Sequence, residues 1–187
     1  MRTLMLTAAA AVLLPAAALT QAPASEVQDL DGWRAAKWGM TEAEALAAFP
    51  GEAERLAKPE RLGEGTATVG IPAYKIQSKE FAVVFGFDEK GGLHLVRITL
   101  TDNIAPGVLH SGSFDLLETL LTEKYGKPTS SKDEQVTPSM SSRTRMWRLP
   151  RTVINLKYTF SAGFGTVKFF DVVMLTYTPP SKEADKL

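Results

Sequence analysis

The chain has 187 residues, of which 44% are hydrophobic and 22% are charged, and its 21 basic residues balance its 21 acidic residues. This composition is typical of a globular protein, and the even charge argues against a general nucleic-acid binder. The absence of cysteine excludes disulfides, thiolate chemistry, cysteine-bound metals and the lipid attachment of a bacterial lipoprotein.

The first 24 residues have the pattern of a cleaved export signal. Arg2 gives a positive start, an uncharged Ala/Leu-rich run follows, and Ala22-Pro23-Ala24 offers small residues to a signal peptidase. An uncleaved membrane anchor is the alternative, but the run is mostly alanine and carries Pro15. We therefore expect a signal peptide over residues 1–24 and a single exported domain over residues 25–187. This domain would work in the periplasm or outside the cell, with no transmembrane segment.

A short helix is expected to begin after Thr41. Thr41 and Glu44 have the spacing of a capping box, and Pro50-Gly51 would end the helix. Trp33 and Trp38 lie just before it. We expect these two indoles to fix the N-terminal arm onto the sheet, and the alternative is that they grip a sugar or a peptide. Residues 52–70 show no clear pattern.

A β-hairpin and a second helix follow. Hydrophobic residues alternate from Phe81 to Phe87, residues 88–92 form a turn, and residues 93–101 return as a second strand. Residues 73–77 are expected to add an earlier strand. Ser113 is the expected N-cap of the second helix, which Gly126 would end.

The last third is expected to be a mobile loop followed by strands. Residues 129–142 are polar and rich in serine, which is typical of a surface loop. Strands are expected over residues 143–149, 154–160 and 166–178, before a polar C-terminal tail. The fold class predicted from this order is α+β, with two main helices packed on one face of an antiparallel sheet. The order of helix and hairpin occurs twice, which suggests a degenerate repeat.

Two short sequence motifs resemble those of known exported proteins. Trp38-Gly39-Met40-Thr41 opens the first helix, and Lys124-Tyr125-Gly126-Lys127-Pro128 closes the second. Together they resemble uncharacterised exported bacterial proteins. The order of helices and strands is similar to the accessory subunit of the outer-membrane β-barrel assembly machine and to β-lactamase-inhibitor-like domains. The resemblance implies a binding or scaffolding module of the cell envelope.

The distribution of charge suggests one candidate binding surface. No acidic residue occurs between Glu134 and Asp171, whereas acidic residues outnumber basic residues over 26–64. A basic sheet face bearing one aromatic side chain would bind an anionic envelope component or an acidic protein loop. The alternative is a set of arginines that pair within the molecule or blunt a sheet edge. The candidate binding residues are Arg143, Arg145, Trp147, Arg148, Arg151 and Lys157.

Other residues give no catalytic pattern. His94 and His110 are the only histidines, so we expect no metal site and no cofactor. A hydrolase of cell-wall or other extracellular polymers would need paired carboxylates. The candidates for that role are Glu42, Glu44, Glu52, Glu54 and Glu60. The sequence therefore favours a non-enzymatic binding or adaptor module of the cell envelope, with the hydrolase as the alternative.

Overall fold

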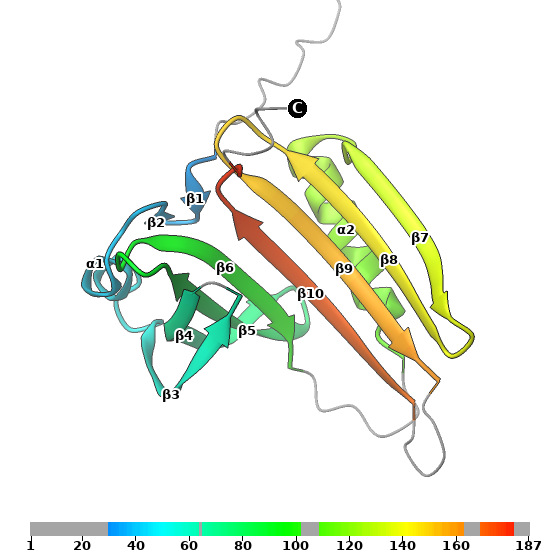
Figure 1. Cartoon of the computed structure of the whole chain (residues 1–187), viewed down its shortest axis with the longest axis horizontal. Helices are drawn as coiled ribbons and strands as arrows, with labels where there is room; N and C mark the ends of the chain where they lie inside the picture. Colours follow the sequence, from blue (N-terminus) through cyan, green and yellow to red (C-terminus); the bar gives the residue numbers. More distant parts are fainter. Residues whose placement is uncertain (1–29, 64, 102–108, 163–168, 182–187) are drawn as a thin grey trace, which may run out of the picture.

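The structure is a computed structural model that describes residues 30–63, 65–101, 109–162 and 169–181 (Figure 1). The expected signal peptide therefore lies outside the described residues, as does most of the C-terminal tail. The elements are β1 Gly32–Trp33, β2 Ala36–Lys37, α1 Glu42–Ala48, β3 Glu54–Leu62, β4 Gly65–Ile76, β5 Lys79–Phe87, β6 Leu93–Leu100, α2 Ser111–Tyr125, β7 Ser130–Thr137, β8 Met140–Arg148, β9 Val153–Ser161 and β10 Phe170–Thr178.

In the described residues, one antiparallel sheet of eight strands dominates, in the spatial order β3-β4-β5-β6-β10-β9-β8-β7. Within the described residues, 56% lie in strands and 16% in helices. The α+β prediction is therefore wrong, and the fold is sheet-dominated. The prediction undercounted strands because several of them are polar and lack the alternation that marks a half-buried strand.

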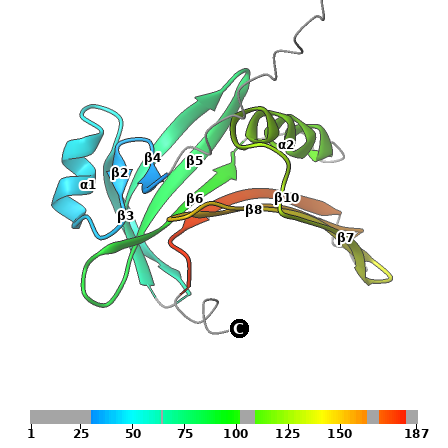
Figure 2. The same ribbon diagram turned by 90° about the horizontal axis from the view of Figure 1, so that it is seen from above.

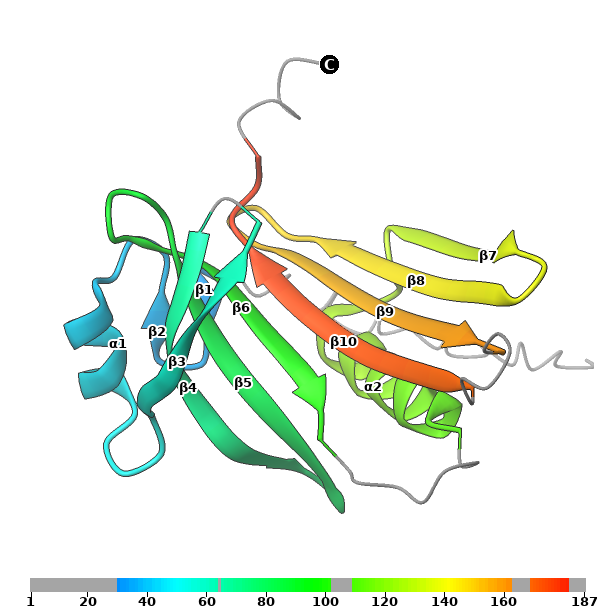
Figure 3. The same cartoon turned by 60° about the horizontal axis from the view of Figure 1, so that its bottom comes forward.

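The same order of elements occurs twice. Helix α1 precedes the four-stranded meander β3–β6, and helix α2 precedes the four-stranded meander β7–β10. The unit is thus a helix and a meander, where the sequence suggested a helix and a hairpin. The two meanders meet at their last strands, β6 and β10, where Ile98 pairs with Leu175 and Val96 with Tyr177 (Figure 3).

The main core lies on the face of the sheet that carries α2 (Figure 2). Alternate residues of the central strands point into it, as the period of two in a strand requires. Helix α2 adds Phe114, Leu117 and Leu121, and Phe49 at the end of α1 packs into the same cluster. A smaller cluster of Leu62, Ala67 and Val84 lies on the other face of the first meander.

The local signals at the start of α1 and in the first hairpin are confirmed. Thr41 and Glu44 form the capping box, and β5 pairs with β6. The predicted N-cap at Ser113 is wrong, because α2 begins at Ser111 with His110 before it. The backbone N–H of His110 donates to the carboxylate of Asp171 on β10, so a contact between distant residues fixes where this helix begins.

The polar segment 129–142 is not a loop, since it forms β7 and the beginning of β8. Every residue of β7 is exposed, and among the described strands β7 pairs with β8 alone, at one edge of the sheet. An edge strand can be polar on both faces, and its charges discourage pairing with other chains. Among the described residues, no helix has the length and apolar character needed to cross a membrane.

Candidate functional site

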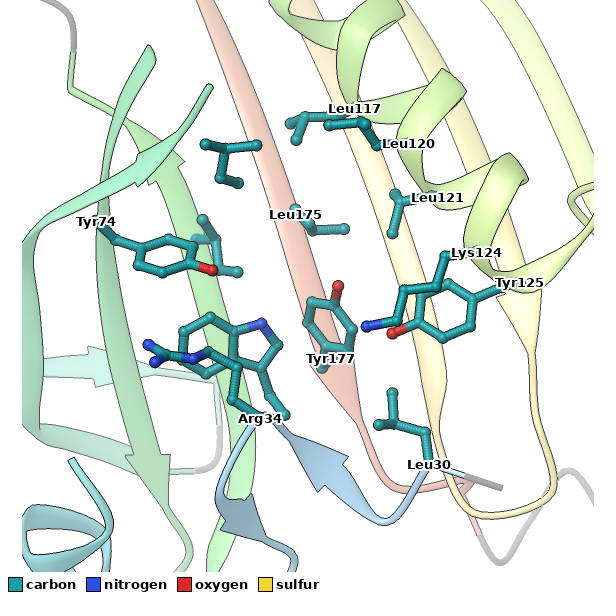
Figure 4. A pocket seen from close by; sticks show the side chains of 13 residues that line it. Leu30, Arg34, Tyr74, Leu117, Leu120, Leu121, Lys124, Tyr125, Leu175 and Tyr177 are labelled. Atoms are coloured by element: carbon teal, nitrogen blue, oxygen red, sulfur yellow. The ribbon is translucent and has the colours of Figure 1, made fainter. Parts of the chain in front are cut away.

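A cleft opens on the helix face between α2 and the first half of the sheet (Figure 4). Its volume is about 380 Å³, which lies in the range of small-molecule sites. Ile98 of β6 and Leu175 and Tyr177 of β10 contribute to its lining, so the cleft lies over the seam between the two meanders. The other lining residues are Leu30, Trp33, Arg34, Tyr74, Ile76, Leu117, Leu120, Leu121, Lys124 and Tyr125.

Arg34 lines one side of the cleft and contacts three aromatic rings and one carboxylate. Its guanidinium lies 5.4 Å, 5.1 Å and 5.3 Å from the ring centres of Trp33, Phe49 and Tyr74. It also donates two hydrogen bonds to Glu52, at 2.7 Å and 3.1 Å. These bonds raise the pKa of Arg34 and lower that of Glu52. The charge of Arg34 is therefore balanced within the protein.

The tight turn between β1 and β2 places Arg34 there. Arg34 has a positive φ of 52°, which is uncommon for a residue with a side chain. Gly32, with φ 133°, approaches the next strand so closely that a Cβ atom would lie 2.0 Å from the carbonyl oxygen of Ala36. Strained backbone of this kind persists where the surrounding structure holds it, and it often occurs at binding sites.

The opposite side of the cleft carries polar groups that have no hydrogen-bond or ion-pair partner in the described part of the chain. The hydroxyl groups of Tyr125 and Tyr177 make no hydrogen bond there, and the ammonium group of Lys124 makes no ion pair. Lys124 lies 5.1 Å from the ring centre of Tyr125. Burial raises the pKa of Tyr177, so its hydroxyl stays protonated. These groups share one end of the cleft (Figure 4).

The residues proposed from the sequence as a basic binding surface do not lie together in the structure. Arg143, Arg145 and Trp147 share one face of β8, as expected, but that face packs against α2. Arg145 is 8% exposed and bonds Glu118 of α2 and Asp133 of β7 at 2.7 Å and 2.5 Å. These hydrogen bonds raise its pKa.

The other residues proposed for the basic surface are either bonded within the protein or exposed on the opposite face of the sheet. Arg143 bonds Asp115 at 2.8 Å, and its guanidinium lies 4.3 Å from the ring centre of Phe114. Trp147 is buried and donates to the carbonyl oxygen of Gly126 at 2.8 Å. Arg151 bonds Asp31 at 3.0 Å. Only Arg148 and Lys157 lie exposed on the opposite face of the sheet, so the six residues do not form one surface.

Trp33 and Trp38 both attach the N-terminal arm. Trp33 is buried among Phe49, Tyr74 and Phe85. The indole N–H of Trp38 bonds the carbonyl oxygen of Arg151 at 2.9 Å and the hydroxyl of Thr152 at 3.0 Å. The fixing role expected for these residues is confirmed, and Trp33 in addition lines the cleft.

Four of the five carboxylates proposed for a hydrolase have structural partners. Glu44 caps α1, and Glu52 bonds Arg34. Glu60 bonds Arg97 at 2.5 Å, and Glu42 accepts from Thr68 at 2.7 Å. The described residues contain no group of three or more His, Asp or Glu side chains placed to hold a metal ion.

His110 belongs to a buried polar cluster that the sequence gave no reason to expect. Its ring Nδ1 contacts the carboxylate of Asp171, which also accepts a hydrogen bond from Tyr158 at 3.1 Å. Burial and the nearby charge of Asp171 raise the pKa of Tyr158 to about 12. Because this cluster joins the start of α2 to β9 and β10, it fixes the helix over the sheet.

Sequence reasoning did not identify the cleft. Its lining residues come from β1, β4, β6, α2 and β10, together with Leu30 before β1 and Arg34 in the turn after it. Of these residues, only Trp33 was considered for binding. A signal in the sequence was the pair of adjacent residues Lys124 and Tyr125 in the last turn of α2, which was interpreted as a helix end and as part of a resemblance, not as a binding site. No protein-family model, curated protein or solved structure matches the chain in the comparisons made.

Proposed function

We propose that the protein is an exported, non-enzymatic binding module and that the cleft between α2 and the first half of the sheet is its binding site. The observation that supports this proposal is an apolar hollow of about 380 Å³ in which Lys124 and the hydroxyl groups of Tyr125 and Tyr177 have no hydrogen-bond or ion-pair partner among the described residues. Small-molecule sites commonly combine an apolar lining with a few such polar groups.

The cleft supports this function better than the basic segment does. In that segment Arg143 and Arg145 are balanced by Asp115, Glu118 and Asp133, so little of their charge remains for a partner. In the cleft, by contrast, Lys124 makes no ion pair with any described residue. The N-terminal signal pattern supports a ligand in the cell envelope or outside the cell.

A neutral fluorescent probe tests whether the cleft binds ligands. N-phenyl-1-naphthylamine becomes fluorescent in apolar surroundings and carries no charge that could select Lys124. We expect the protein to bind it, and Leu120→Arg to weaken binding by about tenfold or more, because the new charge would occupy the cleft and be costly to desolvate. The measurement is a fluorescence titration of each variant.

Leu116→Arg is the matched control. Leu116 is half-buried on the same helix but does not line the cleft, so this variant should bind the probe as the unmodified protein does. Equal probe affinity in all three proteins would mean that the probe binds elsewhere. That outcome, or the absence of probe binding altogether, would refute the assignment of the cleft.

A further inference from the structure

We infer that the cleft selects a small amphipathic anion, with the negative head beside Lys124 and the apolar body along α2. This inference rests on the proposed function, since it names the class of ligand for the same cleft. A medium-chain carboxylate is the simplest molecule with these properties.

The cleft carries charge of one sign along its lining. Its lining contains two cations, Arg34 and Lys124, and no carboxylate. Glu52 balances Arg34 through two hydrogen bonds, whereas no described residue forms an ion pair with Lys124. A bound anion would balance the charge of Lys124, whereas a bound cation would be repelled by it.

Lys124 has two tyrosine side chains beside it (Figure 4). Its ammonium group lies between the side chains of Tyr125 and Tyr177, and the hydroxyl of Tyr177 points into the cleft (Figure 4). Burial raises the pKa of Tyr177, so this hydroxyl keeps its proton and can donate it to an anionic oxygen. A carboxylate accepts several hydrogen bonds, and bonds to a charged acceptor are stronger than neutral ones.

Polar and apolar groups are separated along the cleft. Lys124 and Tyr125 lie in the last turn of α2, whereas Leu117 and Leu120 lie one to two turns earlier on the same helix. Ile76 and Ile98 line the cleft as well. A ligand with one charged end and one hydrocarbon end matches this arrangement, and a sugar, with hydroxyl groups on every side, does not.

Three ligands with the same hydrocarbon body and different heads test the inference: octanoate, octanol and protonated octylamine. Isothermal titration calorimetry should show octanoate binding about tenfold more tightly than either of the others, the advantage expected from charge-assisted hydrogen bonds. Lys124→Gln should remove this advantage and leave octanol affinity unchanged. Lys127→Gln is the control, because Lys127 is exposed just beyond α2 and does not line the cleft.

Each outcome separates this inference from the proposal on which it rests. If octanol binds as well as octanoate, or if Lys124→Gln keeps the preference for octanoate, the anionic selectivity is refuted while the cleft remains a binding site. If N-phenyl-1-naphthylamine binds in the cleft but none of the three octyl ligands binds, the inference alone fails. If the naphthylamine probe and the octyl ligands all fail to bind, the proposed function fails too.

Discussion

The carboxylate of Asp171 connects three elements through one side chain. Its oxygens receive hydrogen bonds from the backbone N–H of His110 at 2.5 Å and from the hydroxyl of Tyr158 at 3.1 Å, and the ring of His110 contacts it as well. Burial alone would raise the pKa of Asp171, but these bonds favour the charged form and hold the pKa below its ordinary value. A single residue therefore links α2, β9 and β10.

This lowered pKa predicts how stability depends on pH. Because the folded pKa lies below the unfolded one, the carboxylate stabilises the protein fully above about pH 4. Its contribution is lost as the pH falls through the folded pKa. Asp171→Asn should therefore lower the free energy of unfolding by about 1 to 2 kcal/mol at pH 7, and the difference from the unmodified protein should shrink towards pH 3. Urea unfolding at both pH values measures this.

Glu123→Gln is the control for that comparison, because Glu123 is exposed on α2 and bonds no described residue. It should cost little stability at either pH. A gap between Asp171→Asn and the unmodified protein that stays constant from pH 7 to pH 3 would show that the carboxylate charge is not what stabilises the cluster.

At the scale of elements, α2 is attached to the second meander by a charge network. Arg143 and Arg145 of β8 bond Asp115 and Glu118 of α2, and Arg145 also bonds Asp133 of β7. The guanidinium of Arg145 lies 5.5 Å from the ring centre of Phe114. The same arginines that suggested a binding face thus position the helix that forms one wall of the cleft.

Removing the buried arginine should loosen this attachment. Arg145→Ala is expected to lower the free energy of unfolding by about 2 kcal/mol, less than for a fully buried ion pair because Asp133 is 57% exposed. Arg148→Ala, on the same strand but exposed on the opposite face, should change stability by less than about 0.5 kcal/mol. Guanidinium unfolding of both variants measures the difference, and equal losses would contradict the anchoring role.

Elements with local signals were predictable, and elements defined by their neighbours were not. The capping box of Thr41 and Glu44 and the alternation from Phe81 to Phe87 depend on short-range spacing, so the sequence shows them. Strands β3 and β7 are polar edge strands, with nearly every residue exposed, and the pattern of a buried face is missing there. Only pairing with β4 and β8 makes them strands.

The cleft could not be predicted for a related reason. Arg34, Tyr74, Lys124 and Tyr177 are far apart in the sequence, and the pairing of β6 with β10 brings their elements together. The basic segment, by contrast, is contiguous and visible in the sequence. The sequence shows that this segment is rich in basic residues. It does not show the carboxylates that balance them, because these lie on α2 and β7 and only the fold brings them close.

At the scale of the whole molecule, the two meanders share one core. Phe85 of β5 and Leu156 of β9 belong to the same buried cluster, which also includes side chains of α2 and the end of α1. The cleft lies where the halves meet, with Leu175 and Tyr177 on one side of the seam and Ile98 on the other. The proposed binding site and the joining of the halves therefore depend on the same strands.

Because the two halves meet at β6 and β10, we expect that the chain can be cut into two fragments that reassemble. Each half is continuous in the sequence, and the connection between them runs from Thr101 to Leu109. A chain cut within that connection should yield two fragments that do not fold alone, since each would expose its part of the common core to water. Mixed together, they should reassemble with the circular dichroism spectrum and probe binding of the intact chain, which would make this fold a split reporter. A fragment that folds by itself would show that the halves are independent.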